Sequence, residues 1–206
     1  MLLRPARSTF LQVQPKPTLE SLDDLLAQAE HYANYCMRNT GRVTPALFLI
    51  GQDGPLMFVP ESLADEHAKG DFATKARLMC VAYAATACVM ALEAWAKFAK
   101  PGEEFDLTEP PPEAFDRREV VVLMGESRDT HKQKLLPIIR SDNGKFFGFG
   151  ESEVPGFSEM KGRFAQLLPT KEPSAEHRAL AKAMLKVTSV EPPMRGSVPP
   201  RPRSRR

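Results

Sequence analysis

A long apolar segment near the middle of the chain constrains the fold more than any other feature. It runs from Leu78 to Trp95, is rich in alanine, and contains Glu93 as its only charged residue. The part before Glu93 is shorter than the roughly 20 apolar residues that a membrane-spanning helix needs, so the segment belongs in a globular core. We predict one helix over residues 71–100, capped by Asp71, ended by Pro101-Gly102 and packed across a sheet.

The remaining hydrophobic patterns predict strands and shorter helices. Apolar residues at helical spacing, followed by a glycine, predict a first helix over residues 18–41. Two β-type runs around a Gly-Gln-Asp-Gly turn predict a hairpin of residues 43–50 and 55–60. Further elements are expected as strands at residues 118–126, 132–140 and 145–151, and as helices at residues 158–168 and 174–187.

This order of elements predicts an α+β fold. Helices and strands neither alternate strictly nor separate into two blocks, which is typical of that class. We expect an α-ββ-α-βββ-α sandwich, in which the long helix packs on a roughly five-stranded antiparallel or mixed sheet. The order is similar to that of roadblock, profilin-like and GAF/PAS-like domains. Because the similarity rests on element order alone, it implies no particular activity.

Composition and charge predict one domain between two basic tails. The chain has 206 residues, 42% of them hydrophobic, which suits a single globular domain. We predict a disordered N-terminal tail over residues 1–17, an α+β domain over residues 18–190, and a disordered Pro/Arg-rich tail over residues 191–206. Residues 1–17 and 192–206 together carry +8 and the whole chain carries +2, so the segment between them carries −6. An acidic body argues against a basic nucleic-acid-binding face.

The chain lacks the familiar signatures of catalysis and metal binding. No nucleophile elbow, metalloprotease motif or phosphate-binding loop occurs in it. The three cysteines form no Cys-x-x-Cys pair and the four histidines are scattered. We therefore predict no catalytic residues, no metal and no cofactor. Unpatterned cysteines are also typical of a reducing compartment, so we predict a cytoplasmic protein.

Glu93 is the charged residue that most invites a functional role. On the predicted helix it falls in phase with apolar neighbours, and a buried carboxylate needs a partner. The obvious basic partners are Arg117 and Arg118, beyond an acidic, proline-rich segment. We predict a Glu–Arg pair that fixes the end of the helix to the start of the next strand. The alternative is that Glu93 and Arg118 line an open pocket.

Two short motifs around this region resemble a pattern in other proteins. Glu93-Ala94-Trp95 is followed, after the proline-rich segment, by Arg117-Arg118-Glu119 and an apolar strand. The combination resembles uncharacterised bacterial proteins with an EAW … RxE motif, over about residues 40–150. The resemblance implies no activity, ligand or catalytic residue. Glu93, Trp95, Arg117, Arg118 and Glu119 are the candidate site.

We expect a non-catalytic protein-interaction or regulatory domain of a bacterial accessory system, with a protein partner or a second copy of itself. One alternative is a ligand-binding protein or hydrolase with Glu93 and Arg118 in a pocket. Another is a nucleic-acid-associated protein that acts electrostatically through its C-terminal tail. That tail contains Arg195, Arg201, Arg203, Arg205 and Arg206.

Overall fold

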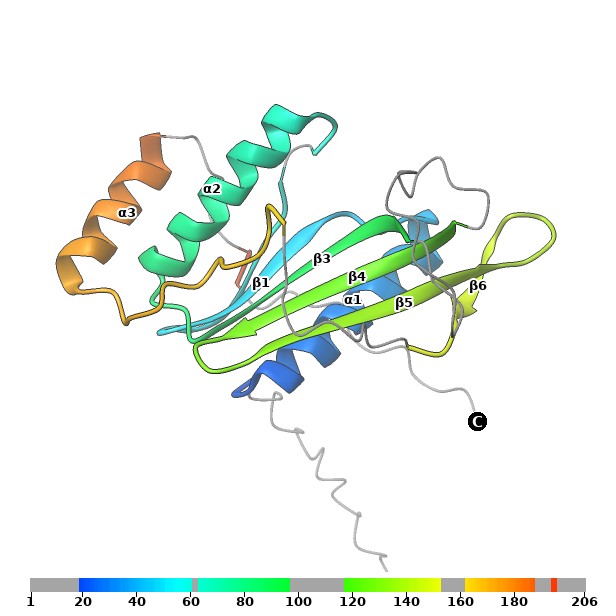
Figure 1. Ribbon diagram of the computed structural model, residues 1–206, viewed down its shortest axis with the longest axis horizontal. Coiled ribbons are helices and arrows are strands. Elements are labelled where there is room, and N and C mark those ends of the chain that lie inside the picture. Colours follow the sequence, from blue (N-terminus) through cyan, green and yellow to red (C-terminus); the bar gives the residue numbers. More distant parts are fainter. Residues whose placement is uncertain (1–18, 61–62, 97–116, 153–161, 188–193, 196–206) are drawn as a thin grey trace, which may run out of the picture.

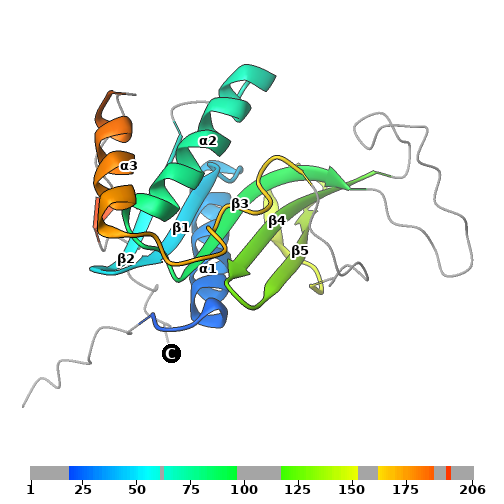
Figure 2. The same cartoon turned by 60° about the vertical axis from the view of Figure 1, so that its left-hand side comes forward.

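A computed structural model describes residues 19–60, 63–96, 117–152, 162–187 and 194–195. These residues form three helices and an antiparallel sheet, so the α+β class is confirmed. The helix α1 (Leu22–Thr40) covers one face of the sheet, and α2 (Glu66–Ala82) and α3 (Ala175–Val187) lie on the other (Figures 1 and 2). No helix among the described residues is long and apolar enough to cross a membrane.

The first helix forms where the sequence predicts it. The Ser21 side chain accepts a hydrogen bond from the Asp24 N–H, and the Asp24 carboxylate accepts one from the Ser21 N–H, which completes a capping box. Gly41 ends the helix in the left-handed conformation, at φ 75°, and its N–H donates to the Met37 carbonyl. The apolar stripe of this helix packs against the sheet.

The sheet is one antiparallel series in the order β6-β5-β4-β3-β1-β2, to which the two-residue β7 (Met194–Arg195) adds beside β2. The predicted hairpin and the three later strands are present. Their bounds are β1 (Ala46–Gly51), β2 (Gly54–Phe58), β4 (Arg118–Ser127), β5 (His131–Arg140) and β6 (Phe146–Phe149).

The predicted long helix is wrong in its second half. The helix α2 begins earlier, with Asp65 as its cap, and ends at Ala82; residues 87–96 then form the strand β3 (Ala87–Ala96). Ala84 has φ 47°, a left-handed conformation that stops the helix. β3 lies between β1 and β4. The sheet therefore has six strands besides the short β7, where five were expected, and the predicted element order lacks β3.

Burial on both faces explains why β3 resembles a helix in sequence. Its first five residues are all buried, because α1 covers one face and α2 the other. An apolar run without alternation does not distinguish a doubly covered strand from a buried helix. The predicted helix at residues 158–168 is also absent where it can be compared, since residues 162–168 form turns and bends; residues 158–161 lie outside the described part.

The last helix matches its prediction. The His177 N–H donates to the Ser174 hydroxyl, which caps α3. Ala181 and Leu185 are buried in the apolar layer that also contains Phe72, Ala76 and Met79 of α2. The Lys182 ammonium lies 5.9 Å from the centre of the Tyr83 ring. These contacts attach α3 to the outer side of α2, at the edge of the molecule (Figure 1).

Candidate functional site

The two halves of the predicted site meet at one end of the sheet. β3 and β4 pair so that Glu93 lies opposite Val121, Trp95 opposite Glu119, and Ala96 opposite Arg118. Paired residues of adjacent strands share a face, and successive residues alternate between faces. Glu93, Trp95 and Glu119 therefore lie on the face that α1 covers, and Arg118 lies on the other. We call Glu93, Trp95, Arg117, Glu119 and Arg140 the Trp95 corner.

Arg140 pairs with Glu119 at this corner. Its guanidinium donates to both oxygens of Glu119, with N–O distances of 2.8 and 2.6 Å. It also donates to the Gly41 carbonyl at 3.3 Å, just beyond the end of α1. A two-pronged pair of this kind fixes orientation as well as distance. This pair joins β4 to β5 and to the end of α1, and it does not include Glu93, for which the pair with an arginine was expected.

Glu93 is half-buried beside this pair. Its carboxylate accepts a hydrogen bond from the Val43 N–H, on the segment between α1 and β1. Burial raises the pKa of Glu93 above its ordinary value, and the Glu119 carboxylate raises it further. The Val43 hydrogen bond and the charges of Arg140 and Arg42 act in the opposite direction and offset this only in part. The ionised form of Glu93 therefore costs stability in the folded state.

This shift predicts a pH dependence that Glu93→Gln should remove. Because the folded-state pKa is raised, the stability contributed by the protonated carboxyl is complete below the unfolded-state pKa and is lost as pH rises through the folded-state value. We expect the free energy of unfolding of the wild type, relative to Glu93→Gln, to fall between about pH 4 and pH 7. Urea denaturation at both pH values measures it. Glu172→Gln, at an exposed position, is the control; a pH-independent difference at Glu93 would contradict the assignment.

Trp95 and Arg117 form the exposed part of the corner. The Arg117 guanidinium carbon lies 4.5 Å from the centre of the Trp95 ring, which is a cation–π distance. Trp95 nevertheless remains 43% exposed. A large aromatic ring thus lies in solvent at the end of β3, next to a fixed Glu119–Arg140 pair.

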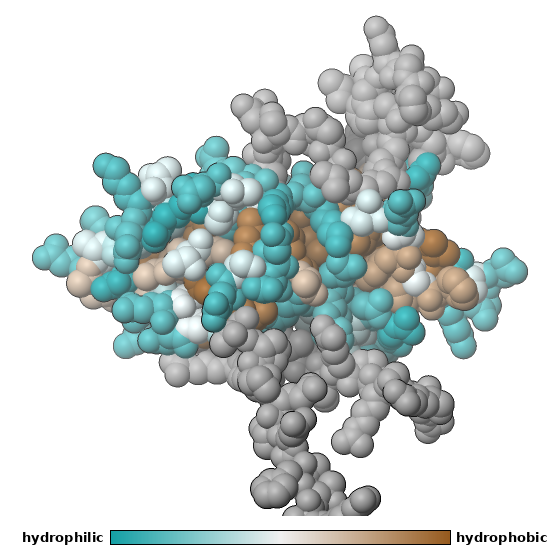
Figure 3. Space-filling view, turned by 90° about the horizontal axis from the view of Figure 1, so that it is seen from below, coloured by the Kyte–Doolittle hydropathy of each residue, from teal (hydrophilic) through white to brown (hydrophobic). Residues whose placement is uncertain are grey.

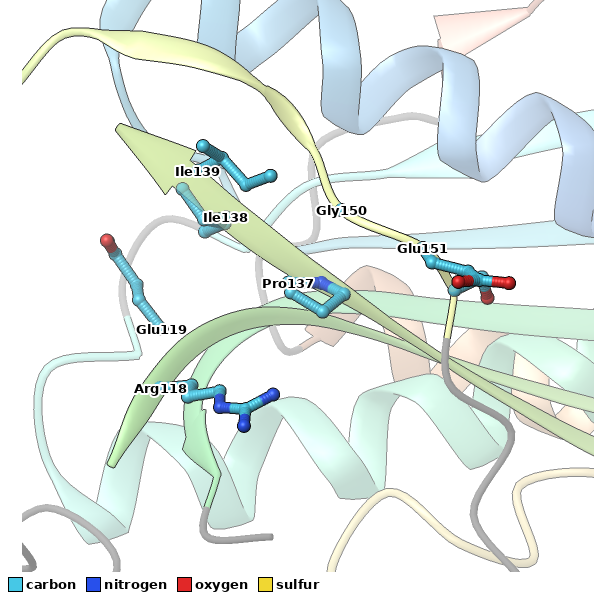
Figure 4. Close-up of a pocket in the computed structure, with 8 residues that line it drawn as sticks. Arg118, Glu119, Pro137, Ile138, Ile139, Gly150 and Glu151 are labelled. Atoms are coloured by element: carbon cyan, nitrogen blue, oxygen red, sulfur yellow. The ribbon is translucent and has the colours of Figure 1, made fainter. Parts of the chain in front are cut away.

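Arg118 lines a cavity that shares Glu119 with the Trp95 corner. The cavity has a volume of about 550 Å³ and is open to solvent. Pro137, Ile138 and Ile139 of β5 form its apolar part, and Glu119, Gly150, Glu151 and Ser152 complete the lining. Figure 4 shows that the side chains of Arg118 and Glu119 leave β4 in different directions. Glu93 does not line this cavity, so the structure separates the two residues that the pocket hypothesis brings together.

The sequence interpretation missed Glu126, which is the most buried charged residue among those described. It is 2% exposed, lies opposite Cys88, and its Oε2 accepts hydrogen bonds from the Leu167 and Leu168 N–H groups at 2.8 and 3.3 Å. Within the described structure, its Oε1 has no hydrogen-bond partner. The sequence feature that could have identified it is an acidic residue near the C-terminal end of a strand that is otherwise apolar. Glu126 fastens the segment before α3 onto the sheet.

Cys80 and Cys88 are buried free thiols, and Cys88 lies opposite Glu126. The hydrogen bond between Cys88 and Cys80 raises the pKa of Cys88, and burial and the nearby Glu126 raise it further. A thiol held protonated is a poor nucleophile and a poor metal ligand. Across the described ranges, no three His, Cys, Asp or Glu side chains are placed to hold a metal ion.

The sequence was compared with known protein families, curated proteins and solved structures. No protein-family model, curated protein or solved structure matches this sequence. Five arginines of the C-terminal tail were predicted to act electrostatically. One of them, Arg195, lies in β7, where its backbone pairs with Leu56 of β2. Arg201, Arg203, Arg205 and Arg206 lie outside the described residues.

Proposed function

We propose that this protein is a protein-interaction domain that binds a partner through the Trp95 corner. The observation that carries the proposal is the 43% exposed ring of Trp95 under the Arg117 guanidinium. Tryptophan and arginine are the residue types most enriched among those that dominate binding energy at interfaces. An exposed aromatic ring has a cost in water that a partner surface relieves.

The surroundings of Trp95 favour recognition by a preorganised surface. The contacts of Arg140 with Glu119 and with the Gly41 carbonyl attach α1 to the strands beside Trp95. A surface that is already ordered loses less conformational entropy when a partner binds. The matching partner would present an apolar side chain to the ring and a carboxylate to Arg117. An accessory or regulatory role in a bacterial system is part of this proposal.

Further apolar side chains are exposed at the same end of the sheet, although Ile139 shares the face of Arg118 and not that of Trp95. Ile139 is 44% exposed on β5 and Phe147 is 74% exposed on β6. Figure 3 shows apolar atoms gathered at the end of the molecule that the β5–β6 hairpin forms. Apolar groups of this kind, surrounded by charged side chains, are typical of interaction surfaces.

The other two hypotheses receive less support. An enzyme that uses Glu93 and Arg118 together needs both side chains in one pocket, and they lie on opposite faces of the sheet. Binding of nucleic acid through the C-terminal tail rests on residues outside the described part. Neither hypothesis has a described side-chain arrangement in its favour.

The proposal is tested by identifying a partner and measuring how variants of the Trp95 corner bind it. The full-length chain should recover a stoichiometric partner by affinity capture, and the purified pair should bind again in solution. We expect Trp95→Ala to weaken that binding by about tenfold or more, because a central aromatic contributes at least about 1.4 kcal/mol. Arg117→Ala should weaken it in the same direction.

Tyr35→Ala provides the control. Tyr35 is 45% exposed but lies on α1 and not in the Trp95 corner, so its loss should leave the affinity unchanged. Equal affinity for wild type and Trp95→Ala would overturn the proposal, as would a chain that binds no protein. Circular dichroism confirms that each variant is folded.

A further inference from the structure

Within the described part of the chain, the helix α3 exposes an apolar face. Its buried residues, Ala181 and Leu185, lie on the side that packs on α2. Leu180 is 60% exposed and Val187 is 84% exposed. The sequence places these residues on one helix stripe, and the structure shows that the stripe faces solvent. One apolar side of α3 is therefore buried on α2, and the apolar residues on the opposite side are available for contact with another protein surface.

The exposed stripe has the spacing of a helix–helix seam. Glu176, Leu180, Ala183 and Val187 follow one another at intervals of four, three and four residues, which keeps them on one side of a helix. All four are exposed. The small Ala183 lets another helix approach closely between the larger Leu180 and Val187.

The first turn of α3 carries an acidic residue on the stripe, and the last turn carries a basic residue that flanks the stripe. Glu176 lies in the first turn of α3 and Lys186 in the last. If a second α3 lies antiparallel, Glu176 of each copy comes next to Lys186 of the other. A parallel arrangement would instead place like charges together. Antiparallel helices also oppose their macrodipoles favourably. The same surface therefore complements itself under a twofold rotation.

We propose that α3 is a self-association surface on which a second copy of this chain docks, α3 against α3 in antiparallel orientation. Leu180, Ala183 and Val187 form the apolar seam, and two Glu176–Lys186 pairs set its direction. The position of α3 at the outer edge of the molecule leaves it accessible (Figure 2). The inference is separate from the proposed function, since α3 and the Trp95 corner belong to different parts of the fold.

The size of the surface predicts a weak dimer. A helix of 13 residues is about 20 Å long, and a single pair of such helices buries less than the roughly 1,600 Å² of a standard stable interface. We expect reversible association that sedimentation velocity detects as a concentration-dependent shift from monomer to dimer. A wild type that sediments as a monomer at every concentration up to the millimolar range would overturn the proposal.

Charge reversal tests the orientation of the two copies. Glu176→Lys alone places the new ammonium group against Lys186 of the second copy, and Lys186→Glu alone places two acidic residues together. Each single variant should weaken self-association by roughly tenfold, because two attractive pairs become repulsive. In an equimolar mixture, the two variants should dimerise with each other like the wild type, since each of the two pairs in the mixed dimer is again one lysine against one glutamate.

The mixture is also the internal control. Both single variants carry an unfavourable charge at an end of α3, so general weakening of the helix would persist after mixing. If the mixture stays monomeric, or if the single variants dimerise as the wild type does, the antiparallel docking is wrong. Leu180→Ser should weaken association in the wild type and in the mixture alike, which reports on the apolar seam.

Discussion

Replacing Glu126 with leucine will lower the free energy of unfolding by about 3 kcal/mol. The substitution keeps an apolar group of similar size in a site that is 2% exposed, but it removes the acceptor for the Leu167 and Leu168 N–H groups. A buried donor without a partner costs about 1–3 kcal/mol, and relief from burying a carboxyl offsets part of the sum. Urea denaturation of wild type and variant measures the difference.

Glu126→Gln separates the hydrogen bonds from the charge. Its side-chain oxygen still accepts from the same two N–H groups, so we expect a loss below about 1 kcal/mol. Hydrogen exchange at Leu167 and Leu168 should accelerate in Glu126→Leu and stay close to the wild-type rate in Glu126→Gln. Glu172→Leu, at an exposed position, controls for the added apolar surface. Equal destabilisation by leucine and glutamine would show that these hydrogen bonds contribute little.

Adding one methyl group at Gly51 will destabilise the fold by about 2 kcal/mol. A Cβ there would lie 3.0 Å from the Tyr83 carbonyl oxygen and 3.3 Å from the Tyr83 Cβ. The Tyr83 carbonyl also accepts the Gln52 N–H at 3.0 Å, so relief of the contact stretches a hydrogen bond. Overpacking against a backbone that cannot yield costs about 1–3 kcal/mol. The contact attaches the β1–β2 turn to the end of α2.

Gly70→Ala should raise the free energy of unfolding, whereas the methyl group at Gly51 lowers it. Gly70 lies within α2, and a Cβ there would meet nothing within 4 Å. Alanine is favoured over glycine in a helix by about 0.5–1 kcal/mol, so this variant should be more stable than the wild type. Thermal denaturation of the two variants beside the wild type gives both signs in one experiment. A shift in the same direction for both would mean that the close approach at Gly51 is relaxed at little cost.

Much of the fold follows from local patterns that a single sequence displays. The capping residues Ser21 and Ser174, the glycine after α1 and the turn between β1 and β2 each act within a few residues, so they can be recognised without a structure. The segment from Leu78 to Trp95 is different. Its division into a helix and a strand depends on β1 and β4 lying on either side, which is a long-range property.

The candidate site shows the same limit. Sequence reasoning selected Glu93, Trp95, Arg117 and Glu119, and pairing of β3 with β4 brings them to one corner. It assigned the partners wrongly because, on a strand, Glu93 and Arg118 face opposite sides. Arg140 and Val43 were missed since they reach the corner from β5 and from the end of α1. Glu126 was missed because its partners lie 41 and 42 residues away in sequence.

The central place of β3 has a consequence for how the chain is made. Synthesis begins at the N-terminus, so α1, β1, β2 and α2 emerge before the strand that β1 pairs with on its inner side. Until residue 96 has left the ribosome, the inner edge of β1 and the apolar side chains of Leu47, Phe48 and Leu49 have no β3 beside them. Unpaired apolar edges are the surfaces on which nascent chains aggregate. Completion of β3 covers the inner edge of β1, and the free edge of β3 then pairs with β4 when that strand follows.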